Sequence, residues 1–398
     1  MNGNQNNDHL PWLDGLRGIA ALWVLLSHVQ ILSGLRSIPV LSWGGLAVDL
    51  FMMLSGFLMA HHYILRKKTE PWNSSRTFLS FWVRRFFRIA PLYYVLLIVA
   101  FSLGPWLGEY RSAIALVWPD TASLLERYTD QSFVNVFAHL SFVFGFLPHF
   151  SFRTPLPDWS IGLEMQFYLA FPVIMLVISR IGPVIASLFI IVGCIAIQAL
   201  FPDYFQQFQM PSFLPIKLYV FLIGILIATS REQRSMQTGL ILALLLAALW
   251  VYFERTPLSV ARVFLVLLMF YLMDNGTLPA SLFLRDGIDK IRSYLSNSVG
   301  IFLGDTSYAA YLLHLIIVLP VAGELAQLPL YLGLKSVYRF GVCLLVVVPI
   351  VYALSWMLYQ LVEKNGIHAG KFVLQAINNR VSKKVTFYRT LILWLYER

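Results

Sequence analysis

Long apolar segments recur along the whole sequence and constrain the fold more than any other feature. Each has roughly 17 to 25 residues, the length that a helix needs to cross the hydrocarbon core of a bilayer. Since no water reaches the backbone there, helices satisfy their own hydrogen bonds and are the expected structure. The composition agrees, because 58% of the 398 residues are hydrophobic and only 13% are charged. The sequence therefore predicts an all-α integral membrane protein.

The apolar segments predict a bundle of about ten transmembrane helices. The expected spans are 12–32, 43–63, 86–106, 159–179, 182–201, 213–230, 236–253, 257–273, 300–320 and 337–361. A further stretch at 132–148 is apolar but short, and it contains Asn135 and His139. An eleventh span there would reverse every later segment and place the basic C-terminal tail outside. We therefore expect 107–158 to be an external region with a re-entrant or interfacial segment.

The net charge of +10 has a topological explanation. Most of the Lys and Arg residues fall in loops that would share one side of the membrane, including 64–85 and 285–292, and in the C-terminal tail. This is the distribution that the positive-inside rule describes, so it does not indicate a nucleic-acid partner. It predicts a multi-pass membrane protein with both termini in the cytoplasm.

Two regions are expected along the chain. A transmembrane domain would occupy 1–363, and a basic cytoplasmic tail would occupy 364–398. The apolar segment at 385–396 is too short to span, so we expect it to lie on the membrane surface. Cys194 and Cys343 both fall within spans, which argues against a disulfide framework and against a thiolate metal site. No metal cofactor is predicted.

Ionisable side chains within spans are costly and usually mark a site or a pathway. Arg17 and His28 are separated by about 16 Å of helix rise and close to three turns, so they lie on one stripe of the first span. Histidine is the usual general base near neutral pH. Arginine can bind a phosphate or a carbonyl oxygen. The alternative is structural, with Arg17 reaching the inner interface and His28 capping a helix end.

Several motifs resemble those of the acyltransferase-3 family of membrane O-acyltransferases, which modify surface polysaccharides, nodulation factors and macrolides. The similar segments are LDGLRGIAA at 13–21 with His28, VDLF at 48–51, LSGF at 54–57, RFFRIAP at 85–91, Trp159 and Ser160 with Glu164, Phe167 and Tyr168, and Ser307 and Tyr308 with Tyr311 and His314. One departure is Asn365, where many members have proline. It affects a helix end rather than the site.

The resemblance implies an enzyme that moves an acyl group, acetyl by preference, from cytoplasmic acyl-CoA to a hydroxyl of an extracytoplasmic sugar. The acceptor would be a surface polysaccharide such as exopolysaccharide or O-antigen, with polysaccharide-assembly proteins as possible partners. The catalytic residues would be His28, Glu164 and Arg17. The donor would be bound by Arg17, Arg84, Arg85 and Arg88. The acceptor would be bound or oriented by Asp49, Asp158, Trp159, Lys217, Tyr311 and His314.

Alternatives remain open from the residues alone. The arginine cluster could reflect topology only, Glu164 could form a structural pair with Lys217, and Arg262 could belong to a similar pair. The intramembrane charges would also suit a transporter or flippase of a polar solute or lipid-linked sugar. A third possibility is an enzyme that passes its acyl group to a partner protein.

Overall fold

The computed structural model describes residues 10–377 apart from 73, 255 and 275. In this part of the chain the secondary structure is helical, without a strand. The first half contains α1 (Pro11–Leu32), α2 (Gly44–Arg66), α3 (Ser75–Val117), η1 (Pro119–Thr121), α4 (Glu126–Thr129), α5 (Phe133–Leu140), η2 (Val143–Phe146), η3 (Pro148–Phe150), α6 (Trp159–Ile181) and α7 (Pro183–Leu200). The second half contains α8 (Pro202–Gln206), α9 (Leu214–Glu232), α10 (Met236–Glu254), α11 (Pro257–Met273), α12 (Leu282–Leu295), α13 (Ser298–Ala326), α14 (Pro329–Leu332), α15 (Ser336–Leu358) and the π-helical turn η4 (Tyr359–Glu363).

The prediction of an all-α, multi-pass membrane protein is confirmed, but the predicted count of ten spans is not. Among the described residues, eight helices are long and apolar enough to cross a membrane: α1, α2, α3, α6, α7, α9, α13 and the continuous helix Ser336–Ile377. The two other predicted spans are also helical, as α10 and α11, and among the residues whose side chains the structure describes they contribute the shorter apolar helices Met236–Ala248 and Pro257–Met273.

Helix α3 is much longer than predicted. It has 43 residues, so it includes Arg76, Arg84 and Arg85, which were expected in the preceding loop, and the first part of the predicted external region 107–158. Pro91 and Pro105 lie within it without ending it. The apolar stretch 132–148 forms the short helix α5 and the turn η2 rather than a spanning helix. The connection between α3 and α6 is therefore made of short helices and turns.

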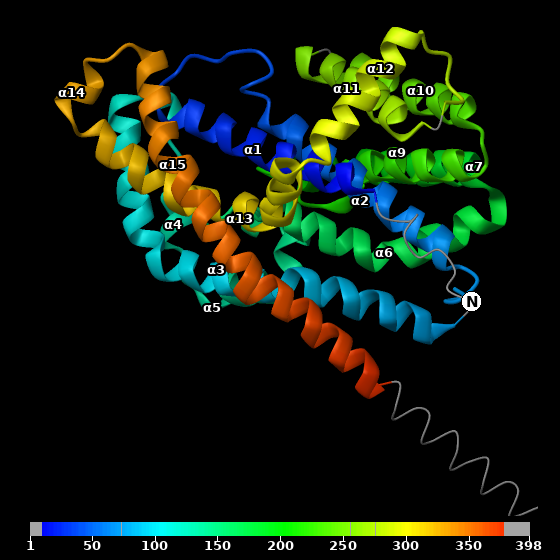
Figure 1. Cartoon of the computed structure of the whole chain (residues 1–398). Coiled ribbons are helices and arrows are strands. Elements are labelled where there is room, and N and C mark those ends of the chain that lie inside the picture. Colours follow the sequence, from blue (N-terminus) through cyan, green and yellow to red (C-terminus); the bar gives the residue numbers. More distant parts are fainter. Residues whose placement is uncertain (1–9, 73, 255, 275, 378–398) are drawn as a thin grey trace, which may run out of the picture.

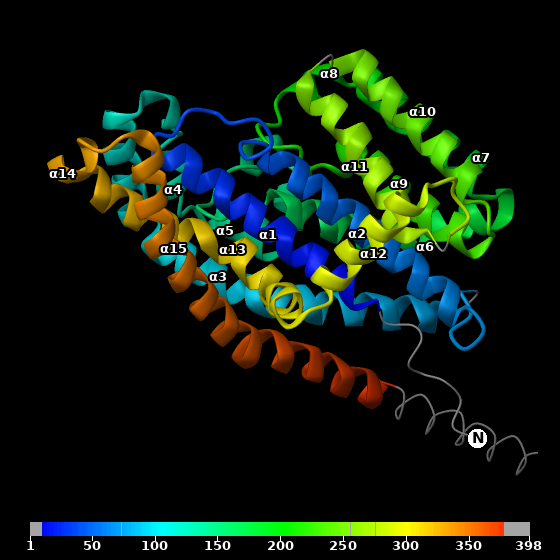
Figure 2. The same cartoon turned by 45° about the horizontal axis from the view of Figure 1, so that its top comes forward.

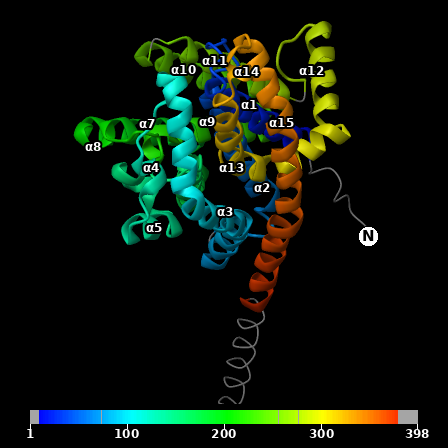
Figure 3. The same cartoon turned by 90° about the vertical axis from the view of Figure 1, so that its left-hand side faces the viewer.

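The C-terminal helix is also longer than predicted. It continues from α15 through η4 to Ile377, so the first part of the expected tail is helical. Figure 3 shows this helix running beside α3. The two pack closely, because a Cβ atom at Gly366 would lie 2.8 Å from Pro91 Cγ. The segment at 385–396 lies outside the described residues.

Helices α1 and α2 lie at the centre of the molecule, with α3, α13 and α15 on one side and α7, α9, α10 and α11 on the other (Figures 1 and 2). The most extensive contacts join α1 to α13 and α2 to α9. Small residues allow both approaches. A Cβ atom at Gly18 would lie 2.5 Å from the backbone of Leu303, and one at Gly56 would lie 2.1 Å from the carbonyl oxygen of Phe221. Gly18 and Gly56, which belong to two of the motifs, therefore allow the helices that carry the candidate site to pack closely.

Candidate active site

Three cavities lie along α1, and the predicted site residues gather around them. The basic cavity has a volume of about 160 Å³ and is lined by Arg17, Arg85 and Arg88, among others. The central cavity has a volume of about 50 Å³ and lies between α1, α2, α6 and α13. The histidine cavity has a volume of about 260 Å³ and is lined by His28 and Trp159.

Neighbouring cavities share parts of their walls. Arg17, Ser55 and Glu164 line both the basic and the central cavity. Val48 and Tyr311 line both the central and the histidine cavity. The three cavities therefore lie in series along α1, from the level of Arg17 to the level of His28, with shared residues in the walls between them.

Side chains beyond the predicted arginines also line the basic cavity. His61 and His62 near the end of α2 line it, as well as the arginines of α3. The Arg85 guanidinium lies 5.9 Å from the ring centroid of Tyr168, and within the described part of the chain its buried Nε has no hydrogen-bond partner. Arg84 stands apart, since it forms a bidentate pair with Glu70 at 2.6 and 3.1 Å and does not line this cavity.

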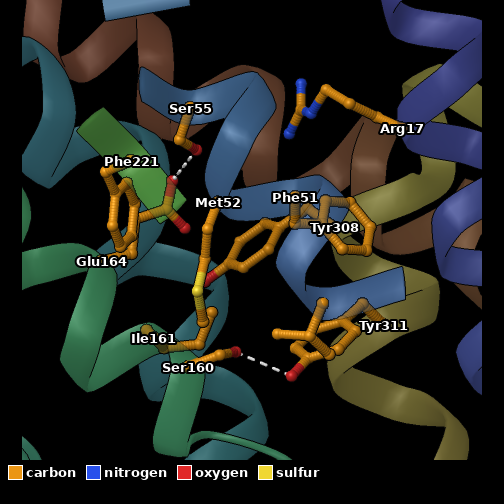
Figure 4. Close-up of a pocket in the computed structure, with 11 residues that line it drawn as sticks. Arg17, Phe51, Met52, Ser55, Ser160, Ile161, Glu164, Phe221, Tyr308 and Tyr311 are labelled. Carbon is orange, nitrogen blue, oxygen red and sulfur yellow. Dashed lines mark hydrogen bonds between the residues drawn. The ribbon is translucent and has the colours of Figure 1, made fainter. Parts of the chain in front are cut away.

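The central cavity is organised around Glu164 of α6 (Figure 4). Its Oε1 accepts a hydrogen bond from Ser55 Oγ of α2 at 2.8 Å and another from the Tyr168 hydroxyl. Arg17 lies across the cavity, with its Nη1 3.9 Å from Asp14 Oδ1. The central cavity is thus lined by a cation from α1, Arg17, and by a carboxylate from α6, Glu164.

Tyr311 closes the central cavity toward the histidine cavity. Its hydroxyl donates to the carbonyl oxygen of Pro157 at 2.9 Å and lies 2.7 Å from Ser160 Oγ. Because a tyrosine hydroxyl has one proton, the Ser160 hydroxyl must be the donor in the second bond. Tyr311 is therefore fixed between α6 and α13 (Figure 4).

His28 of α1 and His314 of α13 form a pair across the helix interface. His28 Nδ1 lies 3.2 Å from His314 Nε2 and 2.9 Å from the carbonyl oxygen of Val24. His314 Nδ1 lies 2.7 Å from the carbonyl oxygen of Tyr311. Since carbonyl oxygens only accept hydrogen bonds, both Nδ1 atoms carry a proton when the rings are neutral.

This assignment leaves His28 Nε2 unprotonated. It makes no hydrogen bond within the described part of the chain, and the His28 side chain lines the histidine cavity. His314 is fully buried, with 0% of its surface exposed. The pair thus holds one ring so that its basic nitrogen is available, which is the arrangement that a general base requires.

Asp49 was predicted to bind or orient the acceptor, but it lines none of the three cavities. Its carboxylate is buried and accepts from Lys217 Nζ at 2.7 Å and from Arg262 Nε at 2.7 Å. Both carboxylate oxygens are used, and the three residues join α2, α9 and α11. The alternative pair between Glu164 and Lys217 is therefore wrong, because Lys217 has Asp49 as its partner. Arg262 belongs to the same group.

Asp158 and Trp159 lie at the start of α6 and differ in their surroundings. Asp158 is buried, and its Oδ2 accepts from Thr154 Oγ1 at 2.9 Å and lies 3.7 Å from His139 Nε2. Burial raises the pKa of Asp158 and lowers the pKa of His139. These contacts fix the loop before α6, while Trp159 lines the histidine cavity.

Sequence reasoning named most of these residues but missed two parts of the site. The pairing of His28 with His314 joins helices that are far apart in the sequence, and no local pattern indicates it. Arg127 and Phe152 line the histidine cavity from the segment between α3 and α6, where no motif was recognised. Arg127 was visible only as an arginine in a polar stretch.

Comparisons with known proteins agree with the motifs. A family model described as an acyltransferase domain matches residues 10–356. The acyltransferase MdmB of Streptomyces mycarofaciens is 26% identical over 344 residues, which cover 78% of this chain and 79% of that protein. The peptidoglycan O-acetyltransferase OatA of Listeria monocytogenes is 31% identical over 179 residues, or 43% of this chain and 25% of that protein. No solved structure matches significantly.

The family match covers almost all of the described helices and the motif residues around the three cavities. The matched region nevertheless spans only a quarter of the Listeria protein. The predicted enzyme class is confirmed at the level of the family, and the transporter alternative has no support from these comparisons. The chain belongs to the acyltransferase family described by this domain model.

Proposed function

We propose that the chain transfers an acyl group, acetyl by preference, from acyl-CoA on one side of the membrane to a sugar hydroxyl on the other. The observation that carries this proposal is the series of cavities along α1, which begins among arginines and ends at His28. A donor bound at one end and an acceptor bound at the other would meet within the bundle.

The basic cavity suits the phosphate groups of CoA. Arginine presents several N–H groups in a fork that fits phosphate oxygens, and Arg17, Arg85 and Arg88 all line this cavity. By the positive-inside rule this end faces the cytoplasm, where acyl-CoA is made. We assign Arg17 to donor binding rather than to oxyanion stabilisation, because it does not line the histidine cavity.

The thioester would pass through the central cavity toward His28. Glu164 lines this route opposite Arg17, so its carboxylate balances the arginine charge where the uncharged arm of the donor must pass. Tyr311 and Val48 form the boundary beyond which the acyl group would reach the acceptor. Glu164 is in this account a positioning residue.

At the histidine cavity, His28 Nε2 would accept the proton of the sugar hydroxyl as its oxygen attacks the thioester carbonyl carbon. The carbon–sulfur bond then breaks, and the CoA thiolate leaves and takes up a proton from His28. An ester and free CoA result. His314 would hold His28 in the tautomer that this step needs.

The acceptor class is proposed from the relatives. OatA is named for peptidoglycan, a sugar polymer outside the cytoplasm. We therefore favour a surface polysaccharide or its precursor, with the protein in the bacterial inner membrane and both termini in the cytoplasm. Polysaccharide-assembly proteins would then be its natural partners.

The experiment is transfer by the purified protein in detergent with acetyl-CoA and an extract of surface polysaccharide. CoA release that requires the acceptor, together with a new ester, supports the proposal. His28→Ala should abolish both, whereas His149→Ala, which changes a histidine outside the three cavities, should not. An active His28→Ala protein would overturn the role of His28. An acyl group retained without acceptor on the wild-type protein, but not on His28→Ala, would identify His28 as a carrier instead.

A further inference from the structure

The histidine cavity contains a buried arginine that plays no part in the transfer described above. Arg127 lies in α4, between α3 and α6, and lines the cavity together with His28 and Trp159. Only 7% of its surface is exposed. Burying a cation is costly unless other groups compensate its charge, so the contacts of Arg127 indicate its role.

Uncharged groups hold Arg127 in place. Its Nε donates to the carbonyl oxygen of Thr154 at 2.8 Å, and its Nη2 lies 3.3 and 3.5 Å from the carbonyl oxygens of Pro155 and Leu156. Its guanidinium carbon lies 3.8 Å from the ring centroid of Phe152. Within the described part of the chain, no carboxylate oxygen lies within the 4.0 Å of an ion pair with Arg127.

The positive charge of Arg127 is thus positioned but not paired. Asp158 is near enough to act on it through space, but the Asp158 carboxylate already accepts from Thr154 and lies beside His139. The second amino nitrogen of Arg127, Nη1, donates no hydrogen bond within the described residues. It therefore leaves two N–H groups without a protein partner on a side chain that lines the cavity.

The other walls of the cavity suit a sugar. Ser27 and Ser42 contribute hydroxyl groups, and Trp159 and Phe152 contribute aromatic rings. We propose that the acceptor carries an anionic group, a carboxylate or a phosphate, which Arg127 binds while His28 takes the proton of a hydroxyl on the same molecule. This inference rests on the proposed function and specifies its acceptor class.

Binding and transfer can be tested separately. Acceptor binding is measured by calorimetry on the His28→Ala protein, and transfer is measured on the wild-type protein. The probes are methyl glucoside, methyl glucuronide and glucose 6-phosphate, which compare a neutral sugar with a carboxylate and a phosphate. Charged hydrogen bonds of this kind correspond to about tenfold to a hundredfold in affinity. We expect at least one anionic probe to bind and react that much better than the neutral one.

Arg127→Gln should remove this preference by raising KM for the anionic acceptor, with little change for methyl glucoside. Arg127→Lys should keep part of it. Arg153→Gln is the matched control, because it removes a cation from the same connecting segment but does not line the cavity. If Arg127→Gln does not fold, the inference is still tested by comparing the three probes, in binding to His28→Ala and in transfer by the wild-type protein.

Equal binding of neutral and anionic probes would overturn the inference. So would an equal loss of kcat for every acceptor in Arg127→Gln, since that result would place Arg127 at the reaction itself. Charge-selective binding without any transfer would support the anion site and contradict the proposed reaction, so the two failures are distinguishable.

Discussion

Replacing His314 tests how the histidine pair works. The contact between His28 Nδ1 and His314 Nε2 is one hydrogen bond of 3.2 Å, and His28 Nδ1 keeps a second partner, the carbonyl oxygen of Val24 at 2.9 Å. A neutral hydrogen bond contributes about 0.5–1.5 kcal/mol. His314→Ala should therefore lower kcat by only about two- to thirteenfold, because Val24 alone still selects the tautomer.

The assay is the initial rate of CoA thiol release by purified protein at saturating acceptor. Since His314 is 0% exposed, it touches neither substrate, and KM should not change. His314→Gln supplies a side-chain oxygen that can accept from His28, so it should recover most of the rate. His28→Ala removes the base and should cost about 10²- to 10⁴-fold. A His314→Ala protein as inactive as His28→Ala, but still folded, would refute this reasoning and make His314 the proton acceptor.

Three further predictions concern charge and packing. Asp49→Asn removes the negative charge that two buried cations share, so it should destabilise the protein by about 3–5 kcal/mol. The melting temperature in detergent should fall, and an unchanged melting temperature would contradict this prediction. Gly18→Leu should prevent α1 from packing on α13 and abolish monodisperse protein in size-exclusion chromatography, whereas Gly193→Leu, which faces open space, should not. Arg88→Gln should raise KM for acetyl-CoA about tenfold or more while Arg84→Gln does not, and equal effects would show that the basic cavity does not bind the donor.

The amino-acid sequence predicts where the long apolar helices lie better than it predicts where they begin and end. Apolar runs located every long helix, because only helices of about that length suit a bilayer. The ends of α3 were wrong because the arginines at its start were assigned to a cytoplasmic loop and the residues after 106 to an external region, whereas the helix runs from Ser75 to Val117. The helix after α15 was missed because its polar residues were interpreted as a tail.

Side-chain partners across helices were the least predictable feature. A structural pair of Glu164 with Lys217 was one alternative from the sequence, but Lys217 has Asp49 as its partner. Residues on one helix fared better, since helical geometry alone places Arg17 and His28 on one stripe. The structure adds that both residues line cavities that lie in series along α1 and share wall residues. Contacts between distant segments, such as His28 with His314, depend on packing that no single helix encodes.

The central claim is that donor and acceptor approach His28 from opposite sides of the membrane. It can be tested in sealed proteoliposomes with the protein in one orientation, with acetyl-CoA supplied on one face and a membrane-impermeant acceptor on the other. The account predicts ester formation only when the donor is on the face of Arg85 and Arg88 and the acceptor is on the opposite face. Transfer that requires both substrates on the same face would contradict it.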